Sequence, residues 1–144
     1  MEINGLPLHP LVVHAAVIFG PLAAVTALLF LVPPWRRRLR WPMVVLALGA
    51  TVLIVAAYLT GTNFLQHRPD LQASPQVQIH KDRGFQLLWV TIAFGAIAVL
   101  AGWLATRTGV LRVLLDVLLG VAAIATLVLV FLTGEAGARA VWGQ

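Results

Sequence analysis

Four histidines and one glutamate are the side chains of this sequence best suited to chemistry. They are His9, His14, His67, His80 and Glu135. His14 lies inside an apolar run with no charged neighbour in the sequence, so its imidazole needs a polar partner elsewhere in the fold. Two imidazoles on facing helices can be the axial ligands of a b-type haem, whereas imidazole and carboxylate together suit Zn²⁺ or Cu²⁺. Three hypotheses about these residues follow.

The first hypothesis is a b-type haem with His14 and His80 as its axial ligands. His80 lies about as far inside the start of its own helix as His14 does, so the two rings are expected at similar depth. Gly84, one turn after His80, leaves room for a flat macrocycle. Lys81 and Arg83 lie where the haem propionates would emerge and can neutralise them through charge-assisted hydrogen bonds.

The second hypothesis is a metal site, and the third is a protein without a cofactor. In the second, His9, His14, His80 and Glu135 coordinate Zn²⁺ or Cu²⁺. In the third, His14 only bonds a backbone carbonyl or Glu135, and the chain is a structural or accessory membrane subunit. His67 lies in the polar stretch 66–70 and is expected to be a solvated loop residue.

No other motif in the sequence indicates catalysis or transport. There is no nucleophile elbow, phosphate loop, HExxH motif or carboxylate pair, so the chain is not expected to be an enzyme on its own. A transporter would need more polar groups at the bilayer midplane. The deepest polar side chains are Thr51, Thr91 and Thr126, each expected to bond its own helix backbone. Asp116 is expected to pair with Arg112, one turn away.

Composition indicates that these residues are carried by membrane-spanning helices. The 144 residues are 60% hydrophobic and 10% charged, whereas a soluble domain is roughly a quarter charged. Each of four apolar runs is about as long as the 20 residues that cross a bilayer. The sequence therefore predicts one all-α domain over residues 1–144, a bundle of four transmembrane helices in a lipid bilayer. The predicted spans are 11–32, 43–61, 85–105 and 113–133.

The distribution of basic residues predicts the orientation of these spans. Six of the ten basic residues lie in the two short loops at 33–42 and 106–112. Such clusters favour the cytoplasmic side, so both termini, and with them the histidines, are expected outside the plasma membrane of a bacterium. The arginine run at 36–40 is therefore interpreted as a topology signal, and nucleic-acid binding is not expected.

Short echoes suggest that the bundle consists of two repeated helical hairpins. Leu59-Thr60-Gly61 ends the second span and Leu132-Thr133-Gly134 ends the fourth, while Phe-Gly pairs occur at 19–20 and 94–95. Two hairpins related by an axis along the membrane normal would produce such echoes. Small residues are expected at the helix interfaces, among them Gly49, Ala50, Ala56, Ala57, Gly120 and Ala123.

The opening segment NGLPLHPLVVH, residues 4–14, resembles the signature of an uncharacterised bacterial membrane family, domain of unknown function 2231. The resemblance covers nearly the whole chain, including a Gly-rich ending, here TGEAGARAVW at residues 133–142. His9, His14 and His80 match motif positions, and Glu135 falls where relatives carry His, Asp or Glu. Ala15 departs from the pattern, which usually has an aromatic there. Related domains are fused to Rieske-type proteins, which implies a redox setting and a redox protein partner. The oligomeric state is left open.

The orientation gives the first testable prediction. A topology reporter fused after Gln144 should behave as extracytoplasmic, because the six arginines of the short loops hold the opposite end in the cytoplasm. The measurement is reporter activity in intact cells, compared with a fusion in the 106–112 loop, which should behave as cytoplasmic. A cytoplasmic C-terminus would overturn the orientation.

Overall fold

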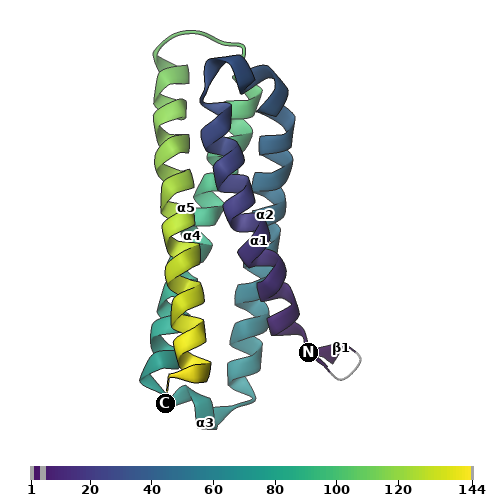
Figure 1. Ribbon diagram of the computed structural model, residues 1–144, viewed down its shortest axis with the longest axis vertical. Coiled ribbons are helices and arrows are strands. Elements are labelled where there is room, and N and C mark those ends of the chain that lie inside the picture. The colour runs from purple at the N-terminus through teal and green to yellow at the C-terminus, as the bar shows by residue number, and fades with distance from the viewer. Residues whose placement is uncertain (1, 4–5, 144) are drawn as a thin grey trace.

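A computed structural model of the chain describes residues 2–3 and 6–143 and is dominated by four long helices (Figure 1). Each of the four is long and apolar enough to cross a membrane, which confirms the predicted four-helix membrane bundle. The long helices are α1 (Leu8–Phe30), α2 (Arg36–Gln66), α4 (Pro75–Trp103) and α5 (Val110–Trp142). The short elements are η1 (Pro33–Trp35), α3 (Pro69–Gln72) and the antiparallel strands β1 (Glu2–Ile3) and β2 (Leu6–Pro7).

Three of the helices extend well beyond the predicted spans. The Pro33–Trp35 segment forms a 3-10 turn, and α2 begins immediately after it, so the whole arginine run is helical. α4 begins at Pro75, where the missing N–H of a first-turn proline removes no helical hydrogen bond. Ser74 precedes it in extended conformation, but its hydroxyl bonds Gln76 and does not cap the helix. His80 therefore lies on a part of α4 that precedes the apolar segment, and His67 directly follows the end of α2.

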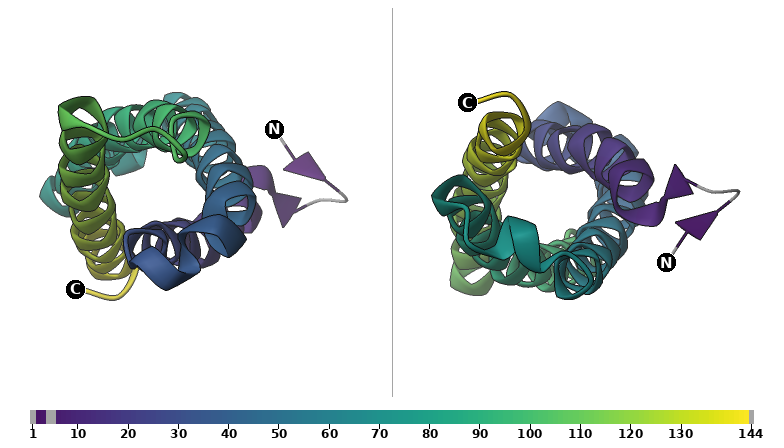
Figure 2. Two further views of the ribbon diagram at one scale, coloured as in Figure 1. Left: turned by 90° about the horizontal axis from the view of Figure 1, so that it is seen from above. Right: turned by 90° about the horizontal axis from the view of Figure 1, so that it is seen from below.

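The four helices form a ring in which α1 and α4 lie on one diagonal (Figure 2). α1 packs on α2 and α5, and α4 packs on the same two helices. Both ends of the chain and α3 lie at one end of the bundle, here called the terminal end (Figure 1). The opposite end, here called the arginine end, holds η1 and the connection between α4 and α5. The antiparallel order places the start of α1 and the start of α4 together at the terminal end.

The core between the helices is built largely from small side chains. Ala23, Ala27, Ala47, Ala98 and Ala123 are fully buried, and larger residues such as Phe30, Phe94, Met43 and Leu119 fill the space between them. Such seams let helix backbones approach closely in lipid.

The predicted packing of small residues is confirmed at Ala50 and Ala123, which are fully buried. It is wrong at Gly49, where a methyl group would meet no atom within 4 Å. Close approaches occur at Gly102, where a Cβ would lie 2.5 Å from Val44 Cγ2, and at Gly95, where it would lie 2.6 Å from Thr51 Oγ1.

The buried positions repeat with the same spacing in the two hairpins, α1–α2 and α4–α5. On the first helix of each hairpin, the buried residues of α1 correspond in order to those of α4: Ala16, Gly20, Ala23, Ala24, Ala27 and Phe30 to Leu87, Thr91, Phe94, Gly95, Ala98 and Ala101. On the second helix, those of α2 correspond to those of α5: Met43, Ala47, Ala50, Ile54 and Thr60 to Leu119, Ala123, Thr126, Val130 and Ala136. The short echoes in the sequence are out of this register, because Phe19 is exposed whereas Phe94 is fully buried. The two hairpins therefore repeat the spacing of their buried residues and not those short sequence motifs.

Two of the three deep threonines bond their own helices as predicted. Thr51 Oγ1 lies 2.8 Å from Ala47 O and Thr126 Oγ1 lies 2.8 Å from Ala122 O. Thr51 also lies 3.2 Å from Thr91 O, so it links α2 to α4. The prediction is wrong for Thr91, whose buried hydroxyl has no partner in the part of the chain that the structure describes.

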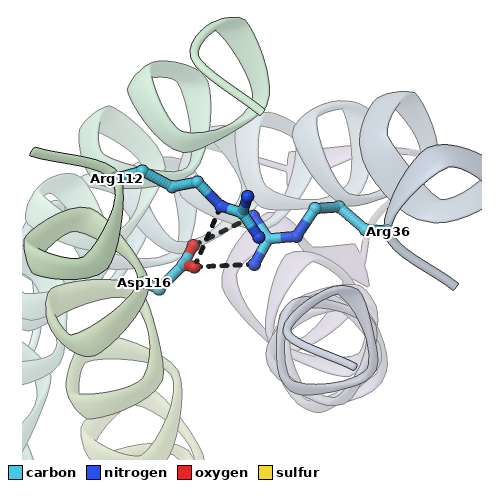
Figure 3. Close-up of polar contacts among 3 residues, drawn as sticks. All are labelled: Arg36, Arg112 and Asp116. Carbon is cyan, nitrogen blue, oxygen red and sulfur yellow. Dashed lines mark hydrogen bonds and ion pairs between the residues drawn. The ribbon is translucent and has the colours of Figure 1, made fainter. Parts of the chain in front are cut away.

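A bidentate ion pair fastens the two hairpins together at the arginine end (Figure 3). Arg36 Nη2 lies 2.7 Å from Asp116 Oδ2, and Arg36 Nη1 lies 3.1 Å from Asp116 Oδ1. Arg36 is only 8% exposed, and its guanidinium lies 4.5 Å from the centroid of the Phe30 ring. The predicted Arg112–Asp116 pair is present but longer, at 3.7 Å. Arg36 is therefore a packing residue as well as part of the arginine run at the start of α2.

Removal of the Asp116 charge should destabilise the bundle. Asp116→Asn leaves Arg36 buried without its carboxylate, so we expect a loss of about 3 kcal/mol in the free energy of unfolding. Thermal unfolding in detergent micelles, followed by circular dichroism, measures the loss. Asp82→Asn is the control, because Asp82 is exposed and its change should stay within about 0.5 kcal/mol. The double variant Arg36→Met/Asp116→Leu should recover most of the stability; an Asp116→Asn variant as stable as the control would contradict this account.

Candidate functional site

The ring of His9 lies against α2 at the terminal end. His9 Nδ1 lies 3.0 Å from Ala57 O and 3.3 Å from Thr60 Oγ1. The ring also stacks with Phe64 at a centroid distance of 6.5 Å and an interplanar angle of 19°. His9 is therefore held in one orientation by contacts from the second helix of its own hairpin.

The ring of His80 makes the corresponding contact in the second hairpin. His80 Nδ1 lies 3.0 Å from Thr133 O on α5, and the bond is partly buried. His9 and His80 occupy corresponding positions in the two hairpins. Ala16 and Leu87 are corresponding buried residues, and His9 precedes Ala16 by the same number of residues as His80 precedes Leu87. The two hairpins thus repeat one histidine-to-carbonyl contact.

A glycine four residues after each acceptor makes room for the ring. A Cβ on Gly61 would lie 2.8 Å from His9 Cε1, and a Cβ on Gly137 would lie 3.0 Å from His80 Cε1. Both distances are shorter than ordinary van der Waals contact, so a side chain at either position would push the imidazole away. We call each set of histidine, carbonyl and glycine a histidine clasp: His9, Ala57 and Gly61 in one, His80, Thr133 and Gly137 in the other.

These contacts fix the tautomer of both imidazoles. A carbonyl oxygen only accepts hydrogen bonds, so Nδ1 must carry the proton in each clasp. Nε2 of the neutral ring is then left with its lone pair, and neither Nε2 has a hydrogen-bond partner among residues 2–3 and 6–143. A backbone carbonyl on one ring nitrogen is the usual support for a histidine whose other nitrogen binds a metal.

The two clasps belong to the diagonal helices α1 and α4. The geometry therefore presents two imidazoles, each bonded to a backbone carbonyl through Nδ1, at the terminal end of the bundle.

His14 does not make the expected pair with His80. It is exposed, and its Nδ1 lies 2.6 Å from Pro10 O on its own helix. Five residues separate it from His9, which turns its side chain by about 140° around the helix axis. His9 faces α2, so His14 projects from a different face of α1. His14 therefore does not share the kind of contact that His80 makes; the residue whose contact corresponds to that of His80 is His9.

The residues predicted around His80 are mostly open to the surroundings. Lys81 is exposed, Arg83 donates to Gln86 Oε1 at 3.2 Å, and a Cβ on Gly84 would meet no atom within 4 Å. Arg83 lines a shallow open hollow between α4 and α5 together with Glu135. These residues lie beside the second clasp, but none contacts the ring of His80 through a hydrogen bond or ion pair in the described chain.

The predicted metal set is not assembled. Glu135 is paired with Arg139 at 2.7 Å, and His14 projects elsewhere. No group of three or more histidine, aspartate or glutamate side chains suited to a metal ion occurs within the described residues. His67 is exposed, as predicted, with Nδ1 2.8 Å from Asn63 O on its own helix.

The clasp glycines give the next prediction. Gly61→Ala should displace the His9 ring and weaken its bond to Ala57 O, whereas Gly49→Ala on the same helix meets nothing and gains helix propensity. We expect Gly61→Ala to be less stable than Gly49→Ala by about 2 kcal/mol, measured by thermal unfolding in micelles. Equal stability of the two variants would show that the first clasp does not hold.

Comparison with known proteins identifies the family but no closer relative. No curated protein and no solved structure matches the chain. A family model described as "Predicted membrane protein (DUF2231)" matches residues 5–144, a range that includes both clasps. The chain belongs to this family of membrane proteins.

Proposed function

We propose that this protein is an electron-transfer subunit of the bacterial plasma membrane that binds a b-type haem between His9 and His80. The observation that carries the proposal is the pair of clasps, which present two imidazoles from diagonal helices, each with a free Nε2. Bis-histidine ligation between facing helices is a common way for a membrane bundle to hold haem.

The number of available ligands favours haem over zinc or copper. A haem iron needs only two axial ligands from the protein, because the macrocycle supplies the other four. A zinc site needs three or four protein ligands, and the described residues gather no such group. Zn²⁺ or Cu²⁺ remains the less favoured alternative for the same pair of imidazoles.

The chain's own residues would orient the cofactor and balance its charge. The carbonyls of Ala57 and Thr133 hold the two rings in the tautomer that a metal requires. Lys81 and Arg83 follow His80 directly and are the proposed partners of the propionates. When bound, the haem would supply one-electron transfer.

The proposed orientation places this site on the outer side of the membrane. Six arginines lie at the arginine end in or beside the two short connections, which favours that end in the cytoplasm. The histidine site would then face an extracytoplasmic redox protein, in keeping with the Rieske-type setting that the family resemblance implies.

The second candidate is a cofactor-free accessory subunit. The observation in its favour is that each clasp already links two helices, so both histidines have a structural role without any ligand. The two candidates differ in whether Nε2 of His9 and His80 is used.

The test is the visible spectrum of protein expressed with ample haem and purified in detergent. We expect a Soret band in the wild type, its loss in His9→Asn and His80→Asn, and its retention in His14→Asn. Asparagine is chosen because its amide nitrogen can replace Nδ1 as donor to the carbonyl, so the helix contact is kept while Nε2 is removed.

The outcome separates the candidates. A colourless wild type with no bound zinc or copper by elemental analysis would leave the accessory-subunit candidate. A Soret band that survives both His9→Asn and His80→Asn would overturn the assignment of the ligands.

A further inference from the structure

The entire net charge of the protein lies at the arginine end. The arginine end holds six arginines and one carboxylate, whereas the terminal end holds four basic and four acidic residues. The first set is Arg36, Arg37, Arg38, Arg40, Arg107 and Arg112 with Asp116, and the second is Arg68, Lys81, Arg83 and Arg139 with Glu2, Asp70, Asp82 and Glu135. The formal net charge of +5 therefore belongs to one face of the bundle.

Half of these six arginines are used within the protein. Arg36 and Arg112 share Asp116, and Arg40 Nε donates to Gly102 O at 2.6 Å near the last turn of α4. The remaining three, Arg37, Arg38 and Arg107, are exposed, and their side chains have no ion pair or hydrogen bond to the rest of the described chain. We call these three the free arginines.

The helix ends at this face add to the excess of positive charge. α2 and α5 both begin here, neither start has a side-chain cap, and neither first turn holds an acidic residue. The start of a helix carries positive partial charge and unbonded N–H groups, which favour an anion. Instead, the first turn of α2 carries arginines, and Arg36 Nε is buried without a partner among the described residues. An external anion would offset both sources of positive charge.

Three exposed tryptophans mark this face as the level of the lipid headgroups. Trp35 precedes α2, Trp41 lies beside Arg40 in its second turn, and Trp103 ends α4. Tryptophan is enriched at the boundary between hydrocarbon and headgroups. The free arginines therefore lie at the depth of phospholipid phosphates rather than in bulk water.

We propose that the arginine end binds the headgroups of anionic phospholipids through Arg37, Arg38 and Arg107. The recognised chemistry is a phosphate whose charge is not neutralised within its own headgroup, as in phosphatidylglycerol, at the depth set by the tryptophans. Each basic residue near an anionic membrane surface strengthens binding about fivefold. The site is independent of the histidine clasps, which lie at the other end of the bundle.

The experiment compares lipids on the intact chain in detergent micelles, where membrane orientation has no influence. Short-chain phosphatidylglycerol is titrated against phosphatidylcholine of the same chain length, and bound lipids are counted by native mass spectrometry. We expect phosphatidylglycerol to be preferred by the wild type, and Arg37→Gln/Arg38→Gln to reduce that preference by roughly 25-fold, about fivefold for each arginine. The matched control, Lys81→Gln/Arg83→Gln, removes two positive charges from the terminal end and should leave the preference unchanged.

Three results would overturn the proposal. They are equal binding of the two lipids by the wild type, an equal loss of preference in the control variant, and displacement of phosphatidylglycerol by millimolar inorganic phosphate. The last would mean that the face binds a free anion and not a lipid. Circular dichroism of each variant checks that the helices are intact, and Arg107→Gln alone provides a second, single-charge readout of about fivefold.

Discussion

The access of side chains to carbonyls that are already bonded within a helix governs three polar contacts between the helices of this protein. Inside a helix the carbonyl of residue i accepts the N–H of residue i+4, and the Cβ of residue i+4 tilts back toward the helix start and covers it. A second donor from a neighbouring helix reaches such a carbonyl only where residue i+4 has no Cβ. Ala57 and Gly61, Thr91 and Gly95, and Thr133 and Gly137 all obey this rule, with His9, Thr51 and His80 as the respective donors. In lipid, where water cannot satisfy these side chains, this geometry decides which polar residues the core accepts.

The repeat of the two hairpins is kept at the terminal end and broken at the arginine end. At the terminal end both hairpins carry the same clasp. At the arginine end, α2 and α5 are compared by aligning their buried residues Met43 and Leu119. In this alignment Arg36 matches Arg112, so the repeat is kept there. Arg40 matches Asp116, so the repeat is broken there. With arginine at all four positions the interface would hold four cations and no carboxylate. The single acidic replacement creates the bidentate pair with Arg36 and leaves Arg40 free to bond Gly102 O.

The sequence alone predicts the four helices, the antiparallel order and the face on which the histidines gather, because the length and spacing of apolar runs determine these features. It does not predict which histidine faces which helix. The distance of each histidine from the start of its helix places His14 and His80 at similar depths in the membrane. The direction in which each side chain points around the helix axis depends on how the helices pack. Residues in contact across the bundle, such as Arg36 and Asp116, are 80 positions apart. The glycines were the available signal: the alignment of the second helices that matches Met43 with Leu119 also matches Gly61 with Gly137.

The uneven distribution of charge bears on what the histidine site can accept. The terminal end has no formal net charge, and two of its acidic residues, Asp70 and Glu135, are paired with Arg68 and Arg139. Lys81 is exposed and Arg83 bonds only an amide, so these two cations are not committed to a carboxylate in the described chain. A ligand that brings negative charge to this end would therefore find basic groups available without breaking an ion pair. The positive excess at the arginine end lies at the opposite end of the bundle, too far from the clasps to pair with a ligand there. Ligand charge at the clasps must be balanced locally, which makes Lys81 and Arg83 the residues on which an anionic cofactor would depend.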